Sequence, residues 1–442
     1  MSVNAYHVTL TAEEPLRIGA GTIGQVVKSQ PHVPGSVLRG ALAARWIAEH
    51  GSPDTVDAQQ REEFLALFEG AIRFGPLFPE GSALVPLPVS HCRYRPWPQC
   101  ASQVVDAAHL PEPASDAPRA CAHCGGPLQP GKGQLQGGVS LVDAMHAPLA
   151  SDETAAEGNL HSREYLPAGT RLQGTIVGEH RWLDAAPGRA WIGGKRSVGG
   201  LASLDVQRME LPTPAAREDG LLHLELQAPG VFVDQAGRPL TSFPLHEIAR
   251  VLEREEPEIV RSWTRMTDVG GWHAASRLPK PMDHALAEGS AVLLRFREGP
   301  LEEHERRLLA ARGLGLRRSE GLGWVVVNPP SRASDPHPDT DQAERDGQPA
   351  ADPDPEGALA VMAYYGHGAD PAVGIPELIA YARGLGVARM HGGAVPATPS
   401  TGGDERSRSM LSLVDRLGPS ELDDLVALLE RHQEATAVGG ST

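Results

Sequence analysis

The sequence predicts an α+β protein made of two successive domains, followed by a linker and a small helical segment. Its 442 residues correspond to two to four domains. Strand-like and helix-like stretches alternate twice along the first 330 residues, which is typical of domains in which helices pack on a sheet. An Asp- and Pro-rich stretch then separates this body from the rest of the chain.

The first predicted domain covers residues 1–210. Its elements are a strand at Tyr6–Thr11, a helix from the N-cap Ser36 to about His50, and strands at Arg171–Gly178 and Ala202–Met209. The helix places Leu38, Leu42 and Trp46 on one face, as in an amphipathic helix. An insertion at about residues 87–159 interrupts the domain and holds all four cysteines.

The second predicted domain covers residues 211–330 and repeats this alternation. Its elements are a strand near Leu222–Gln227, a helix from His246 to about Trp263, a strand at Ala291–Phe296, a helix at Leu301–Arg312 and a strand at Trp324–Val327. Two successive sets of this kind predict two α+β domains joined near Leu211–Gly220.

Residues 331–357 are predicted to be a disordered linker. They hold eight acidic and two basic residues and almost no apolar ones, too few to offset the entropy lost on ordering. Residues 358–442 are predicted to form a small, partly helical segment. There Ser420 can cap a helix with Leu422, Leu425, Val426 and Leu429 on one face, and Gly384–Gly403 has the composition of a loop.

The net charge of −16 does not exclude a nucleic-acid partner. The first 330 residues carry 38 acidic and 32 basic residues, so a locally basic groove is compatible with the total. No window approaches the roughly 18 apolar residues of a membrane span, and residues 1–10 lack the features of a secretory signal. We therefore expect a cytoplasmic protein without a membrane partner.

The four cysteines predict a structural zinc site. Cys92, Cys100, Cys121 and Cys124 lie within 33 residues, and the chain has no other cysteine. Cys121 and Cys124 have the spacing of a zinc half-site, whereas Cys92 and Cys100 are farther apart than usual. The alternative is one half-site beside two buried thiols. The reserve ligands are His91, His109 and His123.

Two glycine-rich loops are the most informative segments. Each has glycines on both sides of a basic pair, and each precedes a strand. The first contains Gly193, Gly194, Lys195, Arg196, Gly199 and Gly200, and the second contains Gly313, Gly315, Arg317, Arg318, Gly321 and Gly323. Glycine lets the backbone approach a phosphate closely, and the cations supply charge. A Rossmann loop is excluded, because its glycines open a helix.

These loops resemble those of the RAMP superfamily of CRISPR-associated proteins. The stretch Gly313–Gly323 matches the family's G-x-G, basic stretch, G-x-G pattern, whereas the first loop lacks the final glycine. Further similarities are Pro15–Gly21, Val33–Gly40 and Arg163–Gly169. The resemblance implies two ferredoxin-like (RRM-type) domains and an RNA-binding role.

Within the superfamily, the chain is most similar to the large two-domain RAMP subunit of type III-D effector complexes. The segments Gly270–His273 and Leu278–Pro281, together with the cysteine-bearing insertion, carry this narrower resemblance. It implies a subunit that caps the 5′ handle of the CRISPR RNA (crRNA) and contacts the large signature subunit and other RAMP subunits, with target RNA nearby. Backbone RAMP subunits and the 3′-end cap are the alternatives.

Binding of RNA without sequence selectivity needs cations for phosphates and flat groups for bases. The loop cations and Arg39 fit the first role, and Trp272 and His273 fit the second. A core position for Trp272 and a solvated helix face for Arg39 are the competing interpretations.

An endoribonuclease is the second functional hypothesis. Its candidate histidines are His32, His273 and His284, and the resemblance adds Asp268 and Asp283. No pattern places any of these beside a partner base, so we assign no catalytic residue. A zinc-containing protein-interaction module without RNA contact is the third hypothesis.

Overall fold

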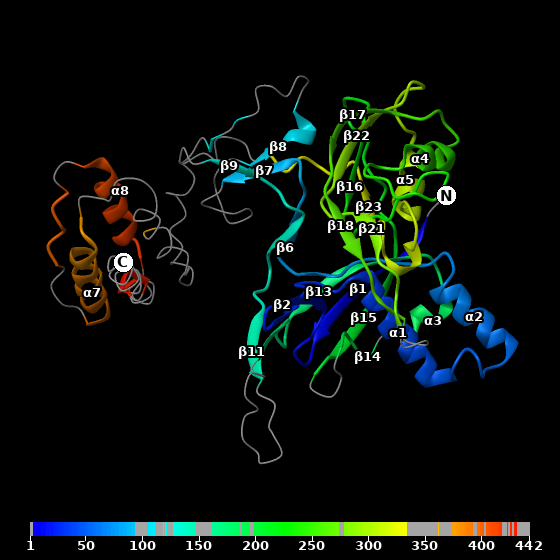
Figure 1. The fold of residues 1–442 in the computed structure, drawn as a ribbon, viewed down its shortest axis with the longest axis horizontal. Helices are drawn as coiled ribbons and strands as arrows, with labels where there is room; N and C mark the ends of the chain where they lie inside the picture. Colours follow the sequence, from blue (N-terminus) through cyan, green and yellow to red (C-terminus); the bar gives the residue numbers. More distant parts are fainter. Residues whose placement is uncertain are drawn as a thin grey trace, which may run out of the picture. The chain divides into compact units, whose positions relative to one another are not determined.

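The structure is a computed structural model of the chain, shown in Figure 1. It describes residues 3–92, 104–110, 118, 120–121, 127–146, 161–185, 188–194, 199–273, 278–333, 361, 373–391, 396–401, 404–417, 422, 425–426 and 428–430. The chain divides into two compact units, Met1–Pro338 and Asp339–Thr442. The predicted α+β class is confirmed.

The first unit begins with an antiparallel sheet of order β14-β15-β1-β13-β4, in which β5 also pairs with β13. Its strands are β1 (Asn4–Ala12), β4 (Arg73–Phe74), β5 (Phe78–Pro79), β13 (Arg171–Val177), β14 (Gly188–Trp191) and β15 (Leu201–Glu210). Its helices are α1 (Gly35–His50), α2 (Ala58–Phe68) and α3 (Arg181–Asp184). If β1, β4, β13 and β15 are counted first to fourth in chain order, their order across the sheet is fourth, first, third, second.

The second sheet of this unit has the order β17-β22-β16-β23. Its elements are β16 (Leu222–Leu226), α4 (Leu245–Leu252), β17 (Glu258–Trp263), β22 (Ala291–Arg295), α5 (Glu303–Arg312) and β23 (Val325–Val327). If β16, β17, β22 and β23 are counted in the same way, the strand order across this sheet, starting at β23, is again fourth, first, third, second. The two predicted strand-and-helix sets thus form two sheets of the same topology.

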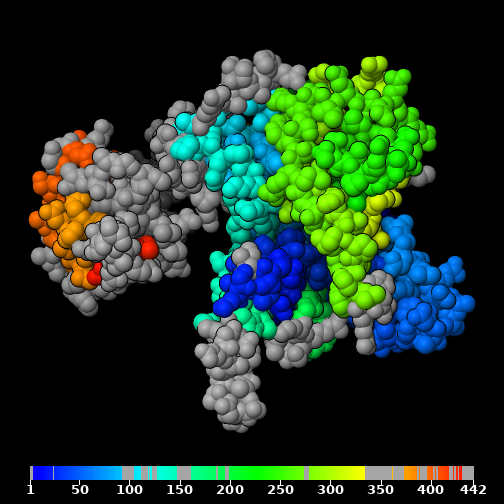
Figure 2. Space-filling model, viewed as in Figure 1, coloured from blue at the N-terminus to red at the C-terminus, as the bar shows by residue number. Residues whose placement is uncertain are grey.

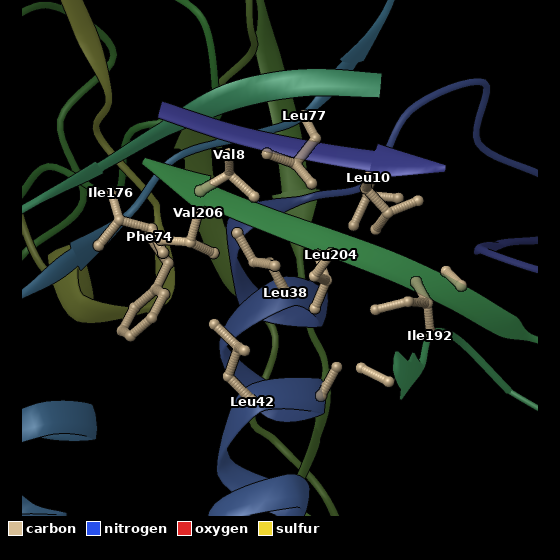
Figure 3. Close-up of a cluster of buried hydrophobic side chains, with 14 of the residues drawn as sticks. Val8, Leu10, Leu38, Leu42, Phe74, Leu77, Ile176, Ile192, Leu204 and Val206 are labelled. Carbon is tan, nitrogen blue, oxygen red and sulfur yellow. The ribbon is translucent and has the colours of Figure 1, made fainter. Parts of the chain in front are cut away.

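The alternating burial of β1 explains how the first core forms. Tyr6, Val8, Leu10 and Ala12 are buried on one face of the strand. In Figure 3 the buried side chains of β1 and the neighbouring strands face Leu38 and Leu42 of α1. A second core lies between β16, β22 and β23 and the helices α4 and α5, which Figure 1 shows beside that sheet.

Smaller strands are inserted between these elements. Strands β11-β12-β3-β2 form a four-stranded sheet, β8-β7-β9 a three-stranded sheet, and β10 pairs with β6. Between β17 and β22, the pairs β18–β21 and β19–β20 form a long hairpin. Their bounds are β2 Gly19–Ile23, β3 Val26–Ser29, β6 Ser82–Val85, β7 Val89–Cys92, β8 Val105–Asp106, β9 Leu128–Pro130, β10 Gln134–Gly137, β11 Val142–His146, β12 His161–Tyr165, β18 Met266–Val269, β19 Trp272–His273, β20 Leu278–Pro279 and β21 Asp283–Leu286.

Two helix predictions for this unit were wrong in detail. The helix predicted over His246–Trp263 ends at Leu252, and residues 258–263 form the strand β17. The reason is local: Glu253 takes a left-handed conformation (φ 55°), and Pro257 disfavours helix in the residue before it. Ser36 is not an N-cap, because α1 begins at Gly35 and its N-cap position is Pro34.

The second unit is helical in its described part. It contains α7 (Ile375–His391), α8 (Glu405–Val414) and helical residues near 422–430. The side chains of Leu422, Leu425, Val426 and Leu429 are all buried in its core, as predicted. The loop predicted from Gly384 was wrong as far as His391, where α7 ends. Ser420 lies outside the described residues.

Two glycine-rich loops as a candidate nucleic-acid interface

The two glycine-rich loops occupy equivalent places in their sheets. Each directly precedes the last strand, β15 or β23, and each lies along the segment that follows the first strand. In the first loop, the Gly194 N–H donates to the carbonyl of Arg17 over 3.1 Å. In the second, the Leu316 N–H donates to the carbonyl of Val231 over 2.9 Å.

Protein packing explains the glycines of the second loop. Gly313, Gly315, Gly321 and Gly323 have φ values of 62°, 81°, 83° and 61°, in the region that favours glycine. A Cβ on Gly321 would lie 2.3 Å from the carbonyl oxygen of Phe74, and one on Gly323 would lie 1.7 Å from that of Leu314. Gly321 therefore allows the loop to pack tightly against the first domain, and Gly323 allows the loop to fold closely on itself.

The first loop differs at one position. A Cβ on Gly193, Gly199 or Gly200 would come within 3 Å of a backbone oxygen, whereas no atom of the described residues lies within 4 Å of such a Cβ on Gly194. The described part of the chain thus leaves the loop backbone open at Gly194. Lys195 and Arg196 lie outside the described residues.

Arg317 is held in an ion-pair network. Its guanidinium lies 2.8 Å from Asp283 and 2.9 Å from Glu320, and it donates to the carbonyl of Gly270 over 3.1 Å. Burial lowers the pKa of Arg317, but hydrogen bonds to Glu320 and Asp283 outweigh this effect and raise it. Lys280 also pairs with Glu320, at 2.6 Å. The network joins the hairpin to the loop and balances two cations with two carboxylates.

The neighbouring Arg318 is less engaged. Its Nη1 lies 3.8 Å from the Glu247 carboxylate, beyond hydrogen-bonding distance, and 32% of its side chain is exposed. Arg39, by contrast, donates to the Phe68 carbonyl over 2.6 Å and pairs with Glu69. Of these two predicted phosphate ligands, Arg318 is the one with an incompletely paired charge.

The exposed aromatic side chains lie at two places. Trp272 is 62% exposed on the hairpin strand β19, so it is not a core aromatic. His273 lies beside it on the same strand, but its side chain is outside the described part. Sequence reasoning missed Trp191, which is 40% exposed and lies just upstream of the first loop. The sequence signal was its position two residues before Gly193.

Sequence reasoning also missed Arg73, because an isolated arginine on a two-residue strand has no motif. Arg73 is buried, and its Nη1 donates to the carbonyl of Ala311 over 2.7 Å. Its guanidinium lies 4.5 Å from the centre of the Trp324 ring. Trp324 packs with Ala5 and Val177 of the first sheet. Arg73 and Trp324 thus join the two sheets, and Figure 2 shows yellow-green segments of the second domain against the blue surface of the first.

Residues 107–110 of the cysteine-bearing insertion contact one face of the second sheet. Arg261 donates to the carbonyls of Ala107 and Leu110, at 2.6 and 2.5 Å. His223 and Glu225 of β16 are buried on this face, and Arg332 forms two 2.8 Å bonds to Glu225. Residues 331–333, predicted as linker, therefore belong to the folded body.

The predicted zinc ligands lie mostly outside the described part. Cys100, Cys124 and His123 are not described, and only the backbone of Cys92 is, in β7. Cys121 is buried. The reserve ligand His91 lies 3.1 Å from the amide nitrogen of Gln129, and His109 lies 3.1 Å from Asp106. Among the described residues, no group of three potential ligands is placed to hold a metal.

The structure brings together two of the catalytic candidates. His284 and Asp268 face each other across β18 and β21, with Nδ1 2.7 Å from Oδ1. Their side chains are 69% and 59% exposed. Asp283 instead pairs with Arg317.

Comparison with known proteins agrees with the RAMP resemblance. Residues 9–200 match the model described as the RAMP superfamily, and residues 144–325 match that described as CRISPR-associated protein (Cas_Cmr3). No curated protein matches the chain. Within the described residues, no helix is long and apolar enough to cross a membrane.

Several solved structures are distantly similar. A chain of the type III-B Cmr-beta complex bound to cognate target RNA and AMPPnP is 15% identical, with a TM-score of 0.38, over 65% of this chain and 86% of that one. A chain of a type IV-B CRISPR complex is 17% identical, with a TM-score of 0.26, over 48% and 95%. Cmr4 from Pyrococcus furiosus is 14% identical, with a TM-score of 0.23, over 48% and 100%.

Proposed function

We propose that this chain is a RAMP-superfamily RNA-binding subunit of a type III CRISPR effector ribonucleoprotein in the cytoplasm. The main observation behind this proposal is that the two sheets have the same topology. Both sheets have the strand order fourth, first, third, second, and both have a glycine-rich loop before the last strand, which supports the proposal of two ferredoxin-like domains. The two family matches extend over both sheets and support the same assignment.

The proposed ligand is the 5′ handle of the crRNA. The first loop offers the open backbone at Gly194, the exposed ring of Trp191 and the charges of Lys195 and Arg196. The second offers Arg318. Phosphates can pair with these cations, and an unstacked base can lie on an exposed indole. Trp272 on the hairpin is a second stacking candidate.

The neighbours in the complex would be the large signature subunit and other RAMP subunits, with target RNA nearby. The narrower prediction is the large two-domain subunit of a type III-D complex. Its competitor is the type III-B subunit, because one matching family model is described as Cas_Cmr3. Reconstitution with the partner subunits of each type would separate the two, since only the correct set should form a stable complex.

Labelled CRISPR-repeat RNA tests the proposal directly. The purified chain and the assembled complex are each mixed with the RNA and run on native and denaturing gels. We expect a shifted, intact RNA and loss of the shift at high salt, because phosphate contacts release counterions. Lys195→Glu with Arg196→Glu, or Arg318→Glu alone, should weaken binding. Arg61→Glu, an exposed change on α2, is the control. Absence of RNA from the purified complex would favour the interaction-module hypothesis.

A structural zinc bound by Cys92, Cys100, Cys121 and Cys124 is a separate proposal. Four thiolates leave no open position for catalysis, so the metal would stabilise the insertion. Elemental analysis of the purified protein should find about one zinc per chain. The amount should fall sharply when Cys121→Ser is combined with Cys124→Ser. Metal-free, folded protein would contradict the proposal.

The His284–Asp268 pair favours an endoribonuclease as the second candidate function. If Nδ1 carries the proton bonded to Asp268, Nε2 can accept the proton of an RNA 2′-hydroxyl. The 2′-oxygen would attack phosphorus and the bond to the 5′-oxygen would break. The imidazolium then returns its proton to that oxygen, giving a 2′,3′-cyclic phosphate and a 5′-hydroxyl. Cleavage that resists chelators and is lost in His284→Ala would establish this activity, and intact RNA would refute it.

A further inference from the structure

Four arginines around the second loop form a cluster whose positive charge is incompletely balanced. They come from four separate elements of the two domains. The members of this guanidinium cluster are Arg73 of β4, Arg250 of α4, Arg312 at the end of α5 and Arg318 of the loop. Figure 1 shows α4 and α5 next to the second sheet, and both contribute side chains to its core.

The innermost member is Arg73, which is 4% exposed. Within the described residues, only its Nη1 has hydrogen-bond partners, the carbonyls of Ala310 and Ala311 at the carboxyl end of α5. Its Nε and Nη2 are buried and have no partner there. The helix end provides partial negative charge, but no carboxylate in the described part of the chain pairs with this guanidinium.

Two further members have buried nitrogens that no described residue hydrogen-bonds. These are Nε of Arg312 and Nη1 of Arg318. The carboxylate beside them is Glu247, whose Oε1 lies 3.8 Å from Arg318. Its other oxygen already accepts the N–H of Gly315 over 2.9 Å. This partly occupied carboxylate therefore acts on both Arg312 and Arg318.

The members also influence one another electrostatically. Burial and, to a smaller extent, the charge of Arg318 together lower the pKa of Arg73 to about 9. Burial has the largest effect on the pKa of Arg312 and lowers it. The charges of Arg318 and Arg250 also lower this pKa, and the charge of Glu247 raises it. Like charges at this range repel, and a bound anion would relieve the repulsion.

Three members of the cluster are accessible to solvent. Arg250 is exposed and Arg312 and Arg318 are half-buried, whereas Arg73 is buried. Arg250 lies three residues after Glu247 on α4, about one helical turn away. An anion in solvent can thus reach guanidinium groups of this cluster. Guanidinium forms paired hydrogen bonds with phosphate oxygens more readily than an ammonium group does.

We propose that Arg250, Arg312 and Arg318, supported by the buried charge of Arg73, form a binding site for a phosphate group of the RNA backbone. The proposal rests on the proposed function, which supplies the RNA. According to this proposal, one phosphate of the bound RNA strand lies where α4, α5 and the second loop meet.

The first arm of the test uses inorganic pyrophosphate and the full chain without RNA. Binding to the folded state should raise the melting temperature by roughly 2–5 °C at ten times the dissociation constant. Arg312→Gln and Arg250→Gln should each reduce this shift. Arg318→Lys keeps the charge but loses the planar donor pair, so this variant should retain part of the shift in melting temperature. Arg61→Gln is the matched control on an exposed helix face.

The second arm measures affinity for repeat RNA as a function of salt. Each lost phosphate contact should reduce the slope of log K against log salt by about 1 and weaken binding roughly tenfold. Melting curves without ligand show whether each variant is folded. Because Arg250 is exposed, its variant tests the site even if Arg312→Gln fails to fold.

The outcomes separate the site from the function. A pyrophosphate shift together with a reduced slope in the variants supports the proposal. A pyrophosphate shift with an unchanged RNA slope means that the cluster binds free phosphate, which overturns the assignment to RNA. No shift and an unchanged slope, in a protein that still binds RNA, overturn the site and leave the proposed function standing. A wild-type chain that binds no RNA, alone or assembled, refutes the proposed function itself.

Discussion

Arg73 and Trp324 lie at the junction of the two sheets, with the guanidinium carbon 4.5 Å from the ring centre. Arg73 belongs to β4 of the first sheet, and Trp324 directly precedes β23 of the second. The arginine also donates to the carbonyls at the end of α5. This contact places the second glycine-rich loop, which lies between α5 and β23, directly on the first domain.

The Arg73–Trp324 contact should contribute to stability in its own right. A desolvated cation–π pair is worth up to about 2 kcal/mol. A double-mutant cycle with Arg73→Met, which removes the cation, and Trp324→Leu, followed by urea unfolding, should give a coupling energy of about that size. Arg238→Met paired with Trp324→Leu is the control, since Arg238 is exposed and pairs with Asp234. Strictly additive effects would show that the two side chains do not interact.

Gly321 should tolerate alanine much less well than Gly237. The two have similar φ values, 83° and 78°. A Cβ on Gly321 would lie 2.3 Å from the Phe74 oxygen, whereas Gly237 has open space around it. Gly237→Ala should therefore cost about 1 kcal/mol, from its conformation alone. Gly321→Ala should cost roughly 3 kcal/mol or more. Equal costs in denaturant unfolding would contradict the packing described here.

The stability of the first unit should fall as the solution is acidified from neutral pH. Burial lowers the pKa of His223 to about 3, whereas an unfolded histidine titrates near 6.5. The unfolded state therefore binds this proton more tightly, and stability is lost as pH falls from about 6.5 towards 3. Between pH 6.5 and 5 the loss from this residue should be about 1.5 kcal/mol.

Urea unfolding of His223→Leu at these two pH values measures that contribution. The variant should lose about 1.5 kcal/mol less than the wild type between pH 6.5 and 5. His304→Leu, a change at an exposed position of α5, should behave like the wild type. The same pH dependence in His223→Leu and the wild type would show that His223 is not the source.

Arg261 should hold the cysteine-bearing insertion on the second sheet. Removing its bonds to the carbonyls of Ala107 and Leu110 leaves these groups to water. Arg261→Ala should therefore speed hydrogen exchange in residues 104–110, with little change in β1. Arg265→Ala, at an exposed neighbouring position, is the control. Unchanged exchange in both variants would mean that other contacts hold the segment.

The repeated topology and the loop positions could be predicted because they depend on local signals. Strand and helix periodicities and clusters of glycine mark the two sets along the chain. Where local sequence signals conflicted, the predicted secondary structure was wrong. Residues 258–263 continue an apolar pattern after α4, and the break at Glu253 and Pro257 decides the strand.

The contacts between the domains could not be read from the sequence. Arg73 meets Ala311 and Trp324 across more than 200 positions, and no short pattern marks such a partner. For the same reason, Arg317 could be predicted as a cation near the loop but not as the partner of Asp283. Whether an arginine is available to a ligand depends on which carboxylates the fold brings to it.

Photo-crosslinking of crRNA within the assembled complex is the most direct test of the account. The central claim is that the two glycine-rich loops hold the 5′ handle. Handle nucleotides carrying a photoreactive base should crosslink to peptides covering residues 188–201 and 313–323, and the yield should fall in Arg318→Glu. Crosslinks confined to other parts of the chain, with no crosslink to either loop, would contradict the claim.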